Sequence, residues 1–106
     1  MIDLVSAIWV TDVGEVRRII KAGADPNFTF EKLGLPLGHA IGHLTTSPKD
    51  PVSQAKKREI IKILLESGAD PNAIESNGRT VYQNFHLLVR PTDQETERLL
   101  IDHGAK

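Results

Sequence analysis

Apolar residues recur at helical spacing in three parts of the chain, and each run ends at a glycine. The runs VRRIIKA, IIKILLES and ERLLIDH stand immediately before Gly23, Gly68 and Gly104. Apolar side chains three and four positions apart form one face of a helix, so each run predicts an amphipathic helix. Glycine just past the last turn adopts the left-handed conformation that ends a helix without strain. The pattern therefore predicts three helices with a shared stop signal.

Further apolar stripes predict a partner helix before each of these three. The first stripe covers residues 4–9 and follows Asp3, a residue type that caps helices. The second follows Pro36, which suits the first turn of a helix because its missing N–H would be unpaired there. Its predicted buried face comprises Leu37, Ala40, Ile41 and Leu44. The third runs from Val81 towards Pro91, so the whole chain is predicted to hold six helices in three pairs.

Capping signals predict where the second helix of the first and last pairs begins. Asp12 and Glu15 have the spacing of a capping box, and so do Thr92 and Glu95. In such a box each side chain bonds the backbone N–H of the other residue. We therefore expect these two helices to begin at Asp12 and at Thr92.

A longer segment separates the two helices of the middle pair. Residues 45–57 contain two prolines and almost no large apolar residue, which predicts a surface loop. Asp50 before Pro51 also predicts the cap and first turn of a lengthened helix that runs to Ser67. Whether this segment is functional or merely tolerated stays open, because long surface loops cost little free energy.

The stop signal belongs to a longer internal repeat. Residues 23–27 read GADPN, and residues 68–72 repeat them letter for letter. A third, shorter copy is Gly104-Ala105. Proline prevents the helix from continuing, and we expect the asparagine to complete a turn by bonding its own backbone. The chain thus repeats a module of helix, sharp stop and extended turn.

The offsets between these copies resemble the ankyrin repeat. Gly23 and Gly68 lie 45 residues apart, and Gly68 and Gly104 lie 36 apart, which is the family's period of about 33 with insertions of 12 and 3 residues. The family stretch Gly-x-Thr-Pro-Leu-His-x-Ala is matched in part by GRTVYQ at residues 78–83 and by LPLGHA at residues 35–40. The resemblance covers essentially the whole chain.

This resemblance implies an all-α fold, an ankyrin-repeat solenoid of three helix-turn-helix units with short extended finger turns between units. The chain is then one ankyrin-repeat domain, with units of about residues 1–27, 28–72 (with the inserted loop 45–57) and 73–106. Seven residues before each stop glycine stand Val16, Ile61 and Glu97. A charge at this core position suits an end unit with a polar outer face, so we expect a real end of the array. Gly38 and Gln83 replace the family's histidine, which predicts weaker bracing between units.

Composition and charge exclude several classes of partner. The 106 residues suffice for one domain, and a formal charge of −1 gives no footprint for nucleic acid or an anionic membrane. The chain has no cysteine and no apolar run of membrane-spanning length. We therefore expect a cytoplasmic protein that is a monomer when free, with another protein as its partner, no nucleic acid and no membrane.

The sequence offers little for catalysis or metal binding. His39 and His43 are four positions apart, a spacing that can place two imidazoles on one metal, yet no third ligand stands near them. No nucleophile elbow, P-loop or Gly-x-Gly-x-x-Gly stretch occurs. We therefore predict no enzyme, no cofactor and no metal site, and a histidine-based metal-dependent protein is the least favoured function.

Two surface features allow two interpretations each. The basic run at residues 56–58 (KKR) is either a solvated helix face or a small docking patch for anions. Trp9 falls near the end of the first helix. It is either an anchor on the concave face, in a line with Val10, His43, Leu87 and Leu88, or a lid over the open end of the stack.

The resemblance implies binding to another protein through finger tips and inner helices. The partner-binding candidates are Trp9, Phe30, Glu31, Lys32, His43, Ser76, Asn77, Arg79 and Leu87. The hypothesis is a non-catalytic protein–protein interaction module, as an inhibitor, an adaptor or a toxin-neutralising immunity protein. The alternative is a structural or self-associating subunit.

Overall fold

A computed structural model describes residues 3–28 and 34–106 of the chain. Six α-helices follow in order: α1 (Leu4–Trp9), α2 (Val13–Lys21), α3 (Pro36–His43), α4 (Pro51–Glu66), α5 (Val81–Leu88) and α6 (Gln94–Asp102). The described residues form no strand, and one isolated antiparallel bridge joins Ile74 to Thr80. The predicted all-α fold of six helices is therefore confirmed. No helix in this part of the chain is long and apolar enough to cross a membrane.

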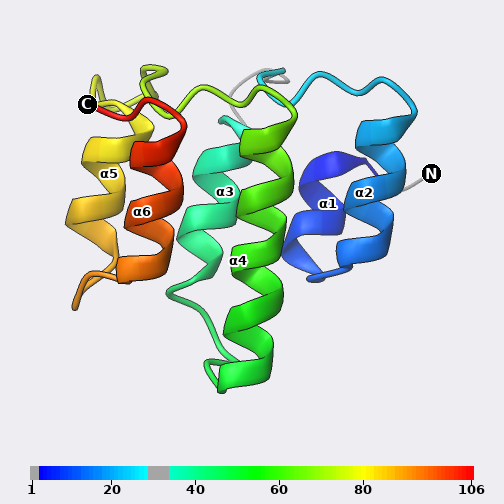
Figure 1. Ribbon diagram of the computed structural model, residues 1–106, viewed down its shortest axis with the longest axis horizontal. Coiled ribbons are helices and arrows are strands. Elements are labelled where there is room, and N and C mark those ends of the chain that lie inside the picture. The colour runs from blue at the N-terminus through cyan, green and yellow to red at the C-terminus, as the bar shows by residue number, and fades with distance from the viewer. Residues whose placement is uncertain (1–2, 29–33) are drawn as a thin grey trace.

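The helices form three neighbouring pairs arranged in two rows (Figure 1). The inner row is α1, α3 and α5, and the outer row is α2, α4 and α6, with contacts between neighbours in each row. The core lies between the rows. The residues predicted to line it from α3, namely Leu37, Ala40, Ile41 and Leu44, are each at most 3% exposed.

The repeated glycines end the outer helices as predicted. Gly23, Gly68 and Gly104 have φ angles of 103°, 106° and 97°, which is the left-handed region. After the first two glycines, the aspartate of each GADPN copy forms the turn. Its Oδ1 accepts the backbone N–H of the asparagine two positions on, at 2.8 Å in both copies. The local turn is therefore built by aspartate, and the prediction that asparagine bonds its own backbone is wrong.

The asparagine of each copy instead bonds the next copy. Asn27 Nδ2 donates to the Gly68 carbonyl at 2.9 Å, and Asn27 Oδ1 accepts the Asp70 N–H at 2.8 Å. Asn72 makes the equivalent pair with the Gly104 carbonyl at 2.8 Å and the Lys106 N–H at 2.9 Å. One side chain thus offers a donor and an acceptor to the following helix stop. The two junctions of the stack are joined in the same way.

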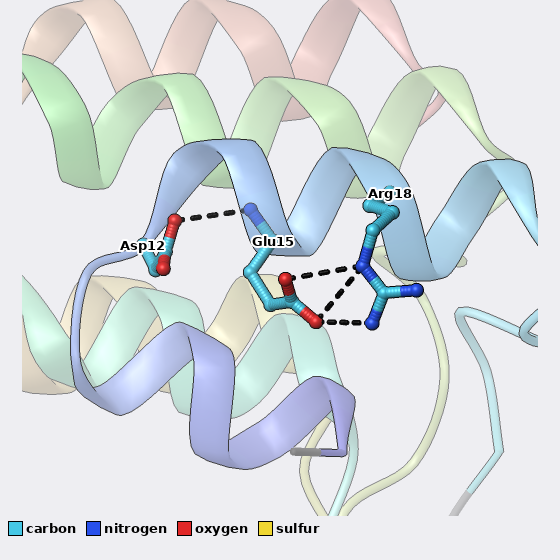
Figure 2. Close-up of polar contacts among 3 residues, drawn as sticks. All are labelled: Asp12, Glu15 and Arg18. Atoms are coloured by element: carbon cyan, nitrogen blue, oxygen red, sulfur yellow. Dashed lines mark hydrogen bonds and ion pairs between the residues drawn. The ribbon is translucent and has the colours of Figure 1, made fainter. Parts of the chain in front are cut away.

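Helix α2 begins with half of the predicted capping box. Asp12 Oδ1 accepts the Glu15 backbone N–H at 3.0 Å, but the Glu15 carboxylate turns away to Arg18 (Figure 2). The Arg18 Nε donates to both Glu15 carboxylate oxygens at 3.1 Å. Hydrogen bonding to Arg18 lowers the pKa of the Glu15 carboxyl. An ion pair along the helix surface has therefore replaced the return bond of the box.

Helix α6 does not begin at the predicted capping box. Its N-cap is Asp93 rather than Thr92, and the Asp93 side chain caps no backbone N–H of the first turn. The Asp93 carboxylate accepts Arg58 Nε at 2.8 Å and Thr96 Oγ1 at 3.2 Å, so it joins α6 to α4. A complete capping box is found at the start of α5, between Thr80 and Gln83. Gln83 thus has a local role at the position where the family carries histidine.

The inserted segment is mostly helix. Helix α4 begins at Pro51, capped by Asp50 as predicted, so residues 51–57 are helical and the surface-loop prediction is wrong there. The extra turns make α4 project beyond its neighbours (Figure 1). The connection from α3 to α4 is only residues 44–50.

Lys57 attaches this connection to α4. Its side chain is 1% exposed, and Nζ donates to the carbonyl oxygens of Thr46 and Pro48, both at 2.7 Å. Burial lowers the pKa of the Lys57 ammonium. Because Arg58 pairs with Asp93, only Lys56 of the basic run is fully exposed. The solvated-face interpretation therefore holds for Lys56 alone, and the three residues do not together form the docking patch that was the alternative interpretation.

The Asn27→Ala change should lower the free energy of unfolding by about 1–2 kcal/mol, because it removes two hydrogen bonds between units. Chemical denaturation followed by circular dichroism measures the change. Asn72→Ala should cost a similar amount, since the second junction has the same geometry. Glu66→Ala, at an exposed helix position, is the control. An Asn27→Ala variant as stable as the wild type would contradict this role.

The Lys57→Met change should lower the free energy of unfolding by about 1–3 kcal/mol, because two carbonyl groups lose a charged donor. Amide hydrogen exchange should also accelerate in residues 44–50, since this connection loses its attachment to α4. Lys56→Met is the matched control on the exposed neighbour. Equal effects of the two substitutions would show that the buried ammonium does not hold the connection.

Candidate functional site

Trp9 lies at the end of α1 and contacts α3 of the next unit. Its indole Nε1 donates to His39 Nδ1 at 3.0 Å, and its ring centroid lies 4.9 Å from that of His43, edge to face. The residue is still 41% exposed. These contacts place it between two inner helices, which contradicts its interpretation as a lid over the open end. Its proposed role as an anchor stays a prediction.

His43 is buried, although the sequence placed it in an exposed line. It is 6% exposed, and its ring nitrogens lie 2.7 Å from the hydroxyls of Thr11 and Thr46. Thr11 has a φ angle of 58°, a conformation that threonine rarely adopts. His43 therefore links the strained turn after α1 to the connection after α3. Burial, and then the positive charge of Lys57, lower the pKa of His43.

The other members of the predicted apolar line are exposed. Val10 is 66% exposed, Leu87 45% and Leu88 57%. They stand at the carboxyl ends of α1 and α5, and α3 lies between these two helices (Figure 1). In the middle of the line, His43 is buried and Gly42 has no side chain. We call Trp9, Val10, Leu87 and Leu88 the Trp9 face.

Some of the predicted finger residues are exposed, and others have side chains that bond within the finger. Phe30, Glu31 and Lys32 of the first finger lie outside the described residues. In the second finger Ser76 and Arg79 are exposed, as the binding prediction requires. Asn77 is exposed as well, but its side chain is held within the finger, because its Nδ2 donates to Asn84 Oδ1 at 2.8 Å. Its Oδ1 also accepts the Arg79 N–H at 3.1 Å.

Glu75 braces the second finger against the preceding unit, and sequence reasoning missed it. Its Oε1 accepts Asn84 Nδ2 at 3.0 Å, and its carboxylate lies against Gly38 of α3. A methyl group at Gly38 would overlap that carboxylate. The glycine that replaces the family's histidine thus leaves room for a different contact between units. Only the register of α3 against the finger reveals this pairing.

The polar groups near Trp9 are hydrogen-bonded to one another. Both ring nitrogens of His43 lie at threonine hydroxyls, and Nδ1 of His39 accepts the Trp9 indole. Within residues 3–28 and 34–106 no group of three His, Cys, Asp or Glu side chains could hold a metal ion. The Trp9 face therefore presents exposed apolar area, and its one aromatic side chain is held by a hydrogen bond to His39.

Acidification should destabilise the fold through His43. Its pKa in the folded state lies below the ordinary value of 6.5, so the unfolded chain binds the proton more strongly. Stability is therefore greatest above that value and falls as the pH drops through it. The His43→Gln change should flatten this dependence between about pH 7.5 and pH 5, the range in which histidine titrates. Urea unfolding at several pH values measures the slope, with His103→Gln as the exposed control. An unchanged slope in His43→Gln would assign the pH dependence to other groups.

Comparison with known proteins gives one informative similarity. No family model matches the sequence. A protein of Treponema pallidum (strain Nichols), described as "Putative ankyrin repeat-containing protein", is 43% identical over 53 residues. The matched region is 50% of this chain and 17% of that protein, so the similarity spans a small part of the relative. The matched half of the chain is therefore similar to an ankyrin repeat-containing protein, and the repeated GADPN stops and the stack of helix pairs agree with that resemblance.

Proposed function

We propose that the chain is a non-catalytic module that binds another protein through the Trp9 face and the finger tips. The observation that carries this proposal is Trp9 itself. A tryptophan that is 41% exposed and also hydrogen-bonded has its ring fixed before any partner arrives. Fixing an anchor in advance reduces the entropy lost on binding, and tryptophan is enriched among the residues that dominate interfaces.

The surroundings of Trp9 support an apolar interface with a polar edge. Val10 and Leu88 each expose more than half of their surface, and a partner that covers them removes apolar area from water. Ser76 and Arg79 are exposed on the second finger and supply polar contacts. A partner that covers both the Trp9 face and the second finger would meet an apolar centre and a charged edge, the arrangement common in protein interfaces.

The finer assignments are proposals on the same basis. The three units are proposed to meet near residues 27 and 72, where the asparagine contacts join them. The module is proposed to be a cytoplasmic monomer that acts as an inhibitor, an adaptor or an immunity protein. Each of these roles requires only that the bound surface of the partner be covered.

Self-association is the second candidate, and an outer surface favours it. Val52 is 65% exposed on the projecting turns of α4. It borders a depression between α2 and α4 lined also by Val13, Pro51 and Ala55. This apolar depression, which we call the Val52 step, suits contact with a second copy of the chain. The Trp9 face and the Val52 step lie on different helices, so substitutions can separate the two functions.

The test compares affinity capture by the wild type with capture by Trp9→Ala combined with Arg79→Glu. A partner recovered in stoichiometric amount is then purified and titrated against each variant. The double variant should weaken binding by at least about 30-fold, which corresponds to about 2 kcal/mol, the size of an interface hot spot. The control is Val52→Ser combined with Lys62→Glu on α4, which should bind as the wild type does.

Three results would contradict the proposal. Equal binding by the wild type and a folded Trp9→Ala/Arg79→Glu variant would exclude the Trp9 face. Loss of binding in the α4 control alone would move the interface to the Val52 step. Light scattering at two concentrations that reports a dimer abolished by Val52→Ser would favour self-association.

A further inference from the structure

The hydrogen bond that holds Trp9 has a fixed direction. An indole N–H can only donate, so His39 Nδ1, which lies 3.0 Å away, must present its lone pair. A histidine with a bare Nδ1 is neutral and carries its proton on Nε2. The contact between α1 and α3 therefore specifies both the charge state and the tautomer of His39.

A second proton on His39 would remove this hydrogen bond and leave only the edge-to-face contact between the two rings, whose centroids lie 5.8 Å apart. Protonated histidine carries hydrogen on both ring nitrogens, so two donors would face each other across 3.0 Å. Histidine is the side chain that ordinarily changes charge between about pH 5 and pH 8. The orientation of Trp9 is thus coupled to a proton equilibrium.

We propose that the Trp9–His39 hydrogen bond is a proton-sensitive latch. Neutral His39 fixes the indole against α3, and protonated His39 releases it while the stack stays folded. The purpose of the latch, regulation of binding at the Trp9 face, rests on the proposed function. Its operation is a property of the free protein, so it is tested without a partner.

His43 supplies a fixed second contact for the indole. Thr46 Oγ1 lies 2.8 Å from the His43 carbonyl and 2.7 Å from His43 Nδ1. A hydroxyl has one proton, so when it donates to the carbonyl it accepts from Nδ1, and Nε2 then accepts from Thr11. Burial and the nearby Lys57 charge lower the pKa of His43, which favours its neutral form in mild acid. Trp9 therefore keeps its contact with the His43 ring when it loses the hydrogen bond to His39.

The inner helices beside α3 contribute few charges to this cluster. Helix α1 contains no ionisable side chain between Leu4 and Trp9. Helix α5 contributes Tyr82 and His86, whose rings are in edge-to-face contact, and His86 lies 3.3 Å from Glu97 of α6. The ionisable groups of α5 are therefore engaged with each other and with α6.

Among the described residues, helix α4 and the second finger each place a charged side chain near this cluster. Lys57 is the buried charge of α4, and its ammonium is directed to the carbonyls of Thr46 and Pro48. Glu75 of the second finger lies against Gly38, the residue next to His39. Lys57 thus adds a positive charge near this cluster and Glu75 a negative one.

The test uses the free protein and its only tryptophan. A ¹H–¹⁵N spectrum contains one indole resonance, which is followed from about pH 7.5 to pH 5, the range in which histidine titrates. The imidazole resonances of the four histidines are recorded in parallel and assigned by substitution. The indole resonance should shift along one titration curve with the midpoint of the His39 ring. In His39→Asn the indole resonance should stay in place, because the asparagine carbonyl accepts a hydrogen bond and takes up no proton in this range.

His103→Asn is the matched control, since His103 is an exposed histidine at the end of α6. It should leave the indole titration unchanged. Circular dichroism at each pH verifies that the helices persist. An indole resonance that stays fixed in the wild type while the His39 ring titrates would overturn the latch. So would an indole midpoint that follows His43, or a folded His39→Asn variant that titrates as the wild type does. None of these outcomes depends on finding a partner, so the latch and the proposed binding function fail separately.

Discussion

The stack depends on one asparagine side chain at each junction between units. A helix pair of this size cannot bury its apolar faces alone, so each unit needs its neighbour at a fixed height. Asn27 provides that registration because its amide offers a donor and an acceptor side by side, as a backbone peptide does in a sheet. Asn72 repeats the arrangement 45 positions later. With the helix stops held level, α1 lies beside α3, and the Trp9 indole reaches His39 and His43.

Features that depend on neighbours in the sequence were predictable. The six helices, the left-handed glycines at their ends and the start of α4 at Pro51 all follow from local propensity and capping chemistry. The apolar face of α3 was predictable for the same reason, because helical periodicity fixes which side is buried. Local signals failed where two of them competed. At the start of α6, the Asp93 carboxylate bonds Arg58 of another helix, so the box expected at Thr92 did not form.

Features that depend on distant residues were not predictable from one sequence. The predicted line of exposed residues included His43, yet the hydroxyl of Thr11, 32 positions earlier in the chain, lies 2.7 Å from its Nε2. Lys57 looked like a member of a solvated basic run because lysine is rarely buried. Its burial became possible only because the carbonyls of Thr46 and Pro48 turn towards it. Likewise, Gly38 indicated a lost contact, since the sequence does not show which side chain faces a glycine.

The inserted segment is connected to the Trp9 face through Thr46. The carbonyl of this residue accepts the Lys57 ammonium from α4, and its hydroxyl lies at the His43 ring that packs against Trp9. The insertion therefore contacts the His43 ring against which Trp9 packs. The His43 ring therefore limits the movement of the Trp9 indole on one side. The other contacts of the indole are with His39, a hydrogen bond and an edge-to-face contact with ring centroids 5.8 Å apart, and the proposed latch acts there through protonation of this half-buried imidazole.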